Sequence, residues 1–189
     1  MKKLLIWMIA AFFTLTAGTF SASAKDGSSQ QRLEIVEAGC NDSQFTVFTS
    51  QEKGGTVSYY LGIGREFDPS EVFGFEILGG TLSVSHIDEV FLCLGSTADE
   101  ALATIDEMLS LFDKDVDAVA EYSARMSTGS GQLGGPTTVT CVVKKKFLSG
   151  KFLRFHFVSG KHNAEADLGK STLKVLRKGL EFDMKRHKN

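Results

Sequence analysis

The sequence predicts an α+β fold: a mostly antiparallel sheet of about six strands, including two hairpins, with two helices packed on one face in the order ββββαββα. Apolar residues alternate with a period of two along several short runs, and glycine-containing turns pair neighbouring runs antiparallel. In separate blocks the period changes to three and four residues, which indicates helices. A chain of 189 residues with 42% hydrophobic and 23% charged residues suits one ordinary globular domain.

The N-terminus is predicted to be a cleaved signal peptide over residues 1–24. Two lysines precede an uncharged, mainly apolar run over residues 4–20, and Ala22-Ser23-Ala24 provides the small residues of a cleavage site. The alternative is an uncleaved anchor, because this run is near the minimum length that crosses a bilayer. We expect residues 25–31 to be a flexible polar leader and residues 32–189 to be a single α+β domain.

Four strands are predicted in the first half of this domain. Residues 44–50 and 56–63 carry apolar side chains on either side of a glycine-containing turn. Residues 72–78 and 81–94 form the first hairpin. They are joined by Gly79-Gly80, a dipeptide that adopts the positive backbone angles of a tight turn.

A helix is predicted to begin after Thr97. Thr97 and Glu100 have the spacing of a capping box, and apolar residues then recur at three- and four-residue spacing as far as Phe112. Similar spacing over residues 116–126 predicts that the helical block continues after a bend. The glycine-rich segment 128–136 is predicted to be a loop.

A second hairpin and a C-terminal helix complete the predicted domain. Residues 139–147 form one strand, with Phe147 on the apolar face, and residues 151–158 form the return strand. From about Leu168 onward, leucines recur at helical spacing. Gly169 and Gly179 weaken this helix prediction by about 1 kcal/mol each relative to alanine.

The three cysteines leave two readings open. Cys40, Cys93 and Cys141 are too few and too widely spaced for a metal ribbon. An oxidising compartment allows one disulfide among them, and the pairing is not determined by the sequence. We favour the alternative that Cys93 and Cys141 are small buried residues within apolar strands.

No cofactor or metal site is expected from the sequence. Residues 164–171 resemble a lenient phosphate-binding loop, but the first glycine is replaced by Ala164, and Glu165 and Asp167 would place negative charge beside a phosphate. The histidines lack the spacing of metal ligands. We therefore assign no ligand of either kind.

A small exported hydrolase is the enzymatic alternative. It would use His86 or His156 as the base, with a nearby carboxylate such as Asp88 or Glu89. A catalytic triad is defined by geometry, and the sequence contains no Gly-x-Ser-x-Gly nucleophile motif. No residue is therefore assigned a catalytic role.

Charge is distributed very unevenly along the chain. Residues 25–143 contain 6 Lys and Arg against 19 Asp and Glu, whereas residues 144–189 contain 13 against 4. This difference allows internal neutralisation, with the basic C-terminal part lying beside the acidic helix, or a basic surface for an anionic partner. The candidate ligand-binding residues are Lys144, Lys145, Lys146, Lys151, Arg154, Lys174, Arg177 and Lys178.

We therefore expect a secreted or periplasmic protein of the cell envelope that acts as a non-enzymatic binding or interaction domain. Its expected partners are an anionic envelope lipid or glycan, or another envelope protein. Nucleic acid is not expected, because the chain is exported and has a formal net charge of −2. No membrane span is expected once the signal peptide is removed.

Overall fold

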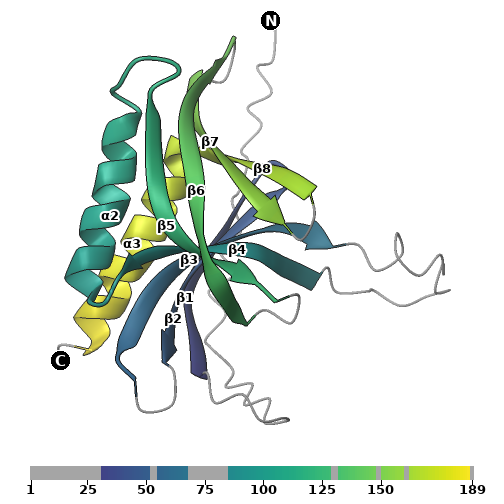
Figure 1. Cartoon of the computed structure of the whole chain (residues 1–189). Coiled ribbons are helices and arrows are strands. Elements are labelled where there is room, and N and C mark those ends of the chain that lie inside the picture. The colour runs from purple at the N-terminus through teal and green to yellow at the C-terminus, as the bar shows by residue number, and fades with distance from the viewer. Residues whose placement is uncertain are drawn as a thin grey trace, which may run out of the picture.

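Within the residues that the structure describes, eight strands and two helices follow one another in the order ββββαββββα (Figure 1). The computed structural model describes residues 31–51, 55–67, 85–128, 132–147, 150–159 and 162–187. The predicted signal peptide, residues 25–30, the predicted strand 72–78 and its Gly79-Gly80 turn lie outside the described residues.

The elements have the following bounds. The first half contains β1 (Gln31–Cys40), β2 (Ser43–Gln51), β3 (Val57–Phe67), β4 (Ser85–Gly95) and α2 (Ala98–Leu111). The second half contains β5 (Val119–Ser127), β6 (Leu133–Lys146), β7 (Gly150–Ser159), β8 (His162–Gly169) and α3 (Lys170–His187). Each half is thus four strands followed by one helix.

The strands form one antiparallel sheet, curled into a half-barrel, in which each strand pairs with the next one in the chain from β1 to β8. The two edge strands approach each other at one end. There, the backbone N–H of Gly169 on β8 donates to the Sγ of Cys40 on β1 over 3.3 Å. The predicted α+β class with an antiparallel sheet is confirmed, and the sheet has eight strands where about six were expected.

Both helices lie on one side of the sheet and complete a single core (Figure 1). Alternate residues of the strands point toward the helices, because successive side chains of a strand face opposite sides. The largest fully buried side chains of this core include Phe45, Phe155, Leu61 and Leu153. The helices add Ile105 and Met108 from α2 and Leu173, Leu176 and Leu180 from α3.

The capping box predicted at the start of α2 is confirmed. The Thr97 hydroxyl accepts a hydrogen bond from the backbone N–H of Glu100 over 3.2 Å, and the Glu100 carboxylate accepts from the backbone N–H of Thr97 over 3.3 Å. The same carboxylate also accepts hydrogen bonds from the backbone N–H and hydroxyl of Ser96. These bonds satisfy donors that the first helical turn leaves without partners.

Gly179 allows α3 to approach β1 closely. A Cβ at this position would lie 2.5 Å from the Cβ and Cγ2 of Val36 and 2.8 Å from its Cγ1. Atoms that close must shift, since carbon atoms in contact are ordinarily about 3.5–4.0 Å apart. The glycine that weakened the helix prediction is therefore required by packing.

The predicted continuation of the helix over residues 116–126 is wrong. Residues from Val119 onward form β5, in which Tyr122 and Ala124 are buried while Val119 is 61% exposed. Alanines fit a helix and a strand equally well, so their spacing alone suggested the wrong period. The inward-facing Tyr122 and the antiparallel pairing of β5 with β6 stabilise the extended form.

Three other boundaries differ from the prediction. β6 begins at Leu133, within the segment predicted to be a loop, and β1 was not predicted. Residues 162–169 form β8, where a loop and the start of the last helix were expected, so the phosphate-loop resemblance falls on an extended strand. The last helix itself is confirmed and begins at Lys170.

The three cysteines are free thiols. Cys141 is fully buried in the main core, as predicted, and burial raises the pKa of its thiol to about 12. Cys93 is partly buried against a smaller aromatic cluster on the other face of the sheet, formed by Phe48, Tyr60 and Phe91. In this structure the disulfide alternative is not realised.

Candidate functional site

The predicted basic residues lie on two elements, the hairpin formed by β6 and β7 and the helix α3. The hairpin contributes Lys144, Lys145 and Lys146 from the end of β6 and Lys151 and Arg154 from β7. The helix contributes Lys174, Arg177 and Lys178. Their local contacts divide them into neutralised and unpaired cations.

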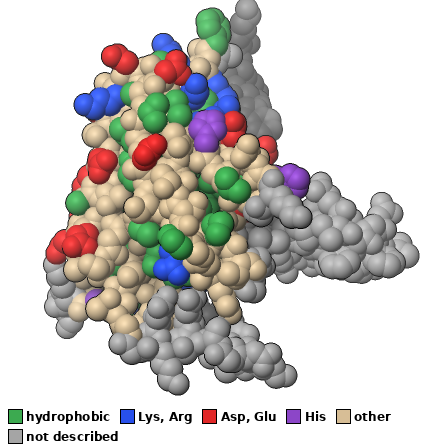
Figure 2. Space-filling model, viewed as in Figure 1, with side chains coloured by type: hydrophobic (Ala, Val, Ile, Leu, Met, Phe, Trp, Pro, Cys, Tyr) green, Lys and Arg blue, Asp and Glu red, His purple; other side chains and the backbone are tan. Residues whose placement is uncertain are grey.

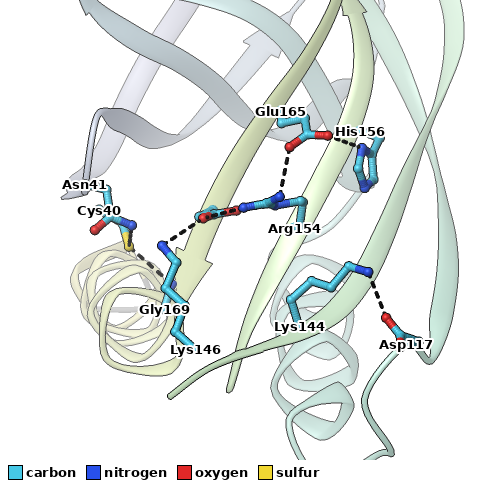
Figure 3. Close-up of polar contacts among 10 residues, drawn as sticks. Cys40, Asn41, Asp117, Lys144, Lys146, Arg154, His156, Glu165 and Gly169 are labelled. Carbon is cyan, nitrogen blue, oxygen red and sulfur yellow. Dashed lines mark hydrogen bonds and ion pairs between the residues drawn. The ribbon is translucent and has the colours of Figure 1, made fainter. Parts of the chain in front are cut away.

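Arg154 is neutralised by the neighbouring strand. Its Nε and NH2 donate to the two carboxylate oxygens of Asp167 over 2.8 Å and 3.1 Å, and its NH1 lies 3.0 Å from the Oε2 of Glu165 (Figure 3). Lys146 donates to Asp167 over 3.3 Å. Burial would raise the pKa of the Asp167 carboxyl, but the hydrogen bonds from Arg154 and Lys146 outweigh it and hold that pKa below its usual value.

Two further hairpin lysines bind the turn that connects α2 to β5. Lys144 donates to Asp117 over 2.7 Å (Figure 3), and Lys151 donates to the backbone carbonyls of Phe112 and Lys114. Lysine donors that satisfy the last carbonyls of a helix fix the position of its C-terminal end. These contacts hold the hairpin against the acidic turn.

Arg177 joins the two helices. Its Nε and NH2 donate to the two carboxylate oxygens of Asp106 on α2 over 2.6 Å and 3.0 Å. It also lies 3.3 Å from Glu181 one turn further along α3. The Asp106 pKa is lowered, first by the hydrogen bond from Arg177. Lys170 pairs with Asp113 at the other end of α2, so the two helices run antiparallel.

Internal ion pairs therefore account for four of the eight candidate residues, Lys144, Lys146, Arg154 and Arg177. A fifth, Lys151, is held by backbone carbonyls. The other three, Lys145, Lys174 and Lys178, are exposed and have no ion pair within the described ranges. On the face shown in Figure 2, basic and acidic side chains are interspersed over the described surface rather than gathered into one basic patch.

Phe147 lies immediately after the hairpin lysines and is 98% exposed. The prediction that it shares the buried face of its strand is wrong, because β6 ends at Lys146 and the chain enters the turn. The sequence shows that apolar residues alternate, but it does not show at which residue the strand ends and the side chains become exposed.

The solvent-facing side of α3 is a second place where cations and apolar side chains meet. We call it the α3 ridge and define it by Lys174, Val175, Lys178, Phe182, Lys185 and Arg186, all of them exposed. These positions are spaced so that they fall on the face opposite the buried Leu173, Leu176 and Leu180. The ridge was only partly predicted, since its apolar members were assigned no role.

The histidines proposed for the hydrolase alternative have different surroundings. His156 Nδ1 lies 3.1 Å from Glu165 (Figure 3), and no hydroxyl or thiol contacts its imidazole in the described part of the chain. Its partner Glu165 lines a surface pocket of about 400 Å³ together with Ser159 and His162. The backbone of His86 and Asp88 belongs to β4, while the side chains of these two residues lie outside the described part. Glu89 is partly buried on the same strand.

Within the residues that the structure describes, no cluster of three or more His, Cys, Asp or Glu side chains could hold a metal ion. None of the described helices has the length and apolar character needed to cross a membrane.

Comparisons of the chain with known protein families, with curated proteins and with solved structures gave no match.

Proposed function

We propose that this chain is an exported, non-enzymatic binding protein of the cell envelope, secreted or periplasmic, that uses its cationic C-terminal part to hold an anionic partner. The observation that carries the proposal is the set of exposed lysines that form no ion pair among the described residues, Lys145, Lys174 and Lys178. The sequence has 23 Asp and Glu against 21 Lys and Arg, so these lysines are not left unpaired by a shortage of carboxylates.

An unpaired surface cation keeps its full attraction for a negative group that arrives from solution. The neutralised residues, such as Arg154 and Arg177, instead fix the hairpin and the helix that carry the unpaired lysines. Charges are screened over about 8 Å at physiological salt. The partner must therefore bring its negative groups into direct contact, as lipid phosphates, acidic glycans or acidic protein surfaces do.

The first experiment measures salt-dependent binding to two anionic probes, a heparin column and phosphatidylglycerol vesicles. It uses the chain from Lys25 onward, which keeps every described residue and omits the apolar residues 4–20. We expect retention that falls as sodium chloride rises and that weakens in the variant with Lys145, Lys174 and Lys178 replaced by alanine.

The matched control replaces three lysines that do have carboxylate partners and lie outside the α3 ridge, Lys144, Lys146 and Lys170. Both triple variants change the net charge equally, so a larger loss in the first shows that unpaired lysines form the surface. Equal losses would mean that total charge governs retention and would overturn the proposed surface. Failure of the unmodified chain to bind either probe would overturn the proposed function.

The hydrolase remains the second candidate, and the pair formed by His156 and Glu165 is the observation that favours it. A histidine held by a carboxylate is the base and orienting group of a catalytic triad, and Ser159 lines the pocket next to Glu165. Hydrolysis of a chromogenic ester that is lost in both His156→Ala and Ser159→Ala would establish the hydrolase activity. If the unmodified protein hydrolyses the ester no faster than buffer does, the hydrolase hypothesis is rejected.

A further inference from the structure

We infer that the α3 ridge lies in the interface of an anionic lipid bilayer, with Phe182 and Val175 among the lipid headgroups and the lysines on either side of them. This inference rests on the proposed function and names the partner and the contact surface. The ridge belongs to one helix, and all of its residues lie within the described range.

The charges of the ridge have one sign. Lys174, Lys178 and Arg186 have no ion pair within the described range, and Lys185, whose partner is Glu181, is 71% exposed at its side chain. The two carboxylates of α3 face the flanks, where Glu181 binds Arg177 and Asp183 lies 3.4 Å from His187. A negatively charged surface can therefore approach the ridge without meeting an unpaired carboxylate of this helix.

The ridge also exposes apolar area between its cations. Phe182 is 60% exposed and Val175 is 42% exposed, and they lie seven residues apart, which is two helical turns. Basic residues alternating with an aromatic and an aliphatic residue on a helix face are typical of helices that lie flat in a membrane interface. Acidic lipids supply the charge attraction, and the acyl boundary accepts the apolar side chains.

The neighbouring helix provides an internal comparison. The exposed side of α2 carries Asp99 and Glu107, and all of its large apolar residues are buried or partly buried. An anionic bilayer repels this surface and attracts the one beside it, which orients the molecule with α3 toward the lipid.

Two other occupants fit less well. A second copy packed on the same ridge through a twofold axis would bring the cations of one α3 against those of the other. A glycan would bind the lysines, but it would gain little from covering Phe182 and Val175. Bilayer contact is the arrangement in which both kinds of side chain are used.

The test places a fluorescent reporter on the ridge. The sequence has one tryptophan, Trp7, so the chain from Lys25 onward has none, and Phe182→Trp introduces a single indole. The matched control is Val119→Trp, because Val119 is 61% exposed on β5, away from the helices. Each variant is mixed with vesicles of phosphatidylglycerol and brominated phosphatidylcholine, and with brominated phosphatidylcholine alone.

We expect Trp fluorescence at position 182 to be quenched by the brominated lipid only when phosphatidylglycerol is present, and fluorescence at position 119 to be unaffected. Lys174 and Lys178 replaced together by alanine should weaken vesicle binding roughly thirty-fold, since a basic residue near an anionic surface contributes about a factor of five. Phe182→Ala should weaken it about five-fold. Replacing Lys114 and Lys146, which lie outside the ridge on the turn after α2 and at the end of β6, removes the same charge and should change it by less than the ridge pair.

The outcomes separate this inference from the proposed function. Salt-dependent binding to heparin and vesicles without quenching at position 182 would show that the α3 ridge does not contact the bilayer. The proposed function, binding of an anionic partner, would not be affected by that result. Quenching of Phe147→Trp but not of Phe182→Trp would move the contact to the hairpin tip and overturn the inference. A shift in elution volume of the free chain that is abolished in Phe182→Ala would identify a second copy as the occupant. Absence of any anionic binding would overturn both proposals.

Far-UV circular dichroism and a thermal melt confirm that each variant is folded.

Discussion

Replacing Gly179 by alanine tests whether the close approach of α3 to β1 is a packing requirement. In an exposed helix interior the substitution would stabilise the protein by about 1 kcal/mol, because alanine is the better helix former. Here the added Cβ would lie 2.5 Å from two atoms of Val36 and 2.8 Å from a third.

The cost of the contact exceeds the gain in helix propensity. Relieving it requires α3 to move about 1 Å away from β1, and overpacking of this kind costs about 1–3 kcal/mol. Three close contacts place Gly179→Ala toward the upper end of that range, so we expect a net loss of about 1–2 kcal/mol. The measurement is the free energy of unfolding from urea titration. The dependence of that free energy on urea concentration should be the same for the variant and the parent.

Two comparisons isolate the cause. Lys178 occupies the adjacent, exposed position, so Lys178→Gly measured against Lys178→Ala gives the propensity difference in the same turn. Val36→Gly removes all three contacting atoms, and in that background Gly179→Ala should become stabilising by about 1 kcal/mol. If Gly179→Ala alone stabilises the protein as much as alanine does at position 178, the packing explanation is refuted.

Three further predictions concern single contacts. Thr97→Ala removes the N-cap hydroxyl of α2 and should lower the free energy of unfolding by about 1 kcal/mol in urea titration; no change would mean that the cap is replaced by water. Asp167→Asn weakens the hydrogen bonds from Arg154 and Lys146 and should cost about 1–2 kcal/mol at neutral pH. The folded pKa of Asp167 is lowered, so its contribution is complete above its unfolded pKa of about 3.9 and is lost as the pH falls through the folded value. Urea titrations across that range should therefore show the free energies of unfolding of the variant and the parent converging as the pH falls. A difference that stays constant with pH would contradict a stabilising role for the ionised Asp167. The Cys141 thiol, fully buried and with a pKa raised to about 12, should be alkylated by iodoacetamide only as fast as the protein unfolds, as followed by mass spectrometry; rapid alkylation of the native protein would contradict its burial.

The elements predicted correctly are those in which one periodic signal stands alone. The helix α2 combines a capping box with an uninterrupted apolar stripe, and β2 and β7 show clear alternation, so local sequence was sufficient. The strand β5 lacked such a signal, because Ala120 and Ala124 satisfy either period, and its identity depends on pairing with β6.

The edge strands escaped prediction for a different reason. Two of the inward residues of β8, Ala164 and Ala166, are small, and its outward residues Glu165 and Asp167 are poor strand formers. They are stabilised by Arg154 across the strand, a partner that sequence spacing does not reveal. In β1 the register shifts between Glu34 and Val36, which breaks the alternation.

The charge pattern of the candidate site was visible in the sequence, but the pairing of individual charges was not. Lys145 and Lys146 are adjacent and chemically identical. In the described part of the chain, however, only Lys146 pairs with a carboxylate, that of Asp167 on β8. Which cations remain unpaired depends on the sheet register and on the position of α3, and both are tertiary properties.

The strand order has a consequence for when the molecule can fold. Every sheet contact joins strands that are neighbours in the chain, so the meander can form from local pairing. The core cannot form in this way, because Leu173, Leu176 and Leu180 belong to the 18-residue α3, which follows all the described strands and also covers β1. A chain still being synthesised therefore presents an apolar sheet surface until α3 emerges.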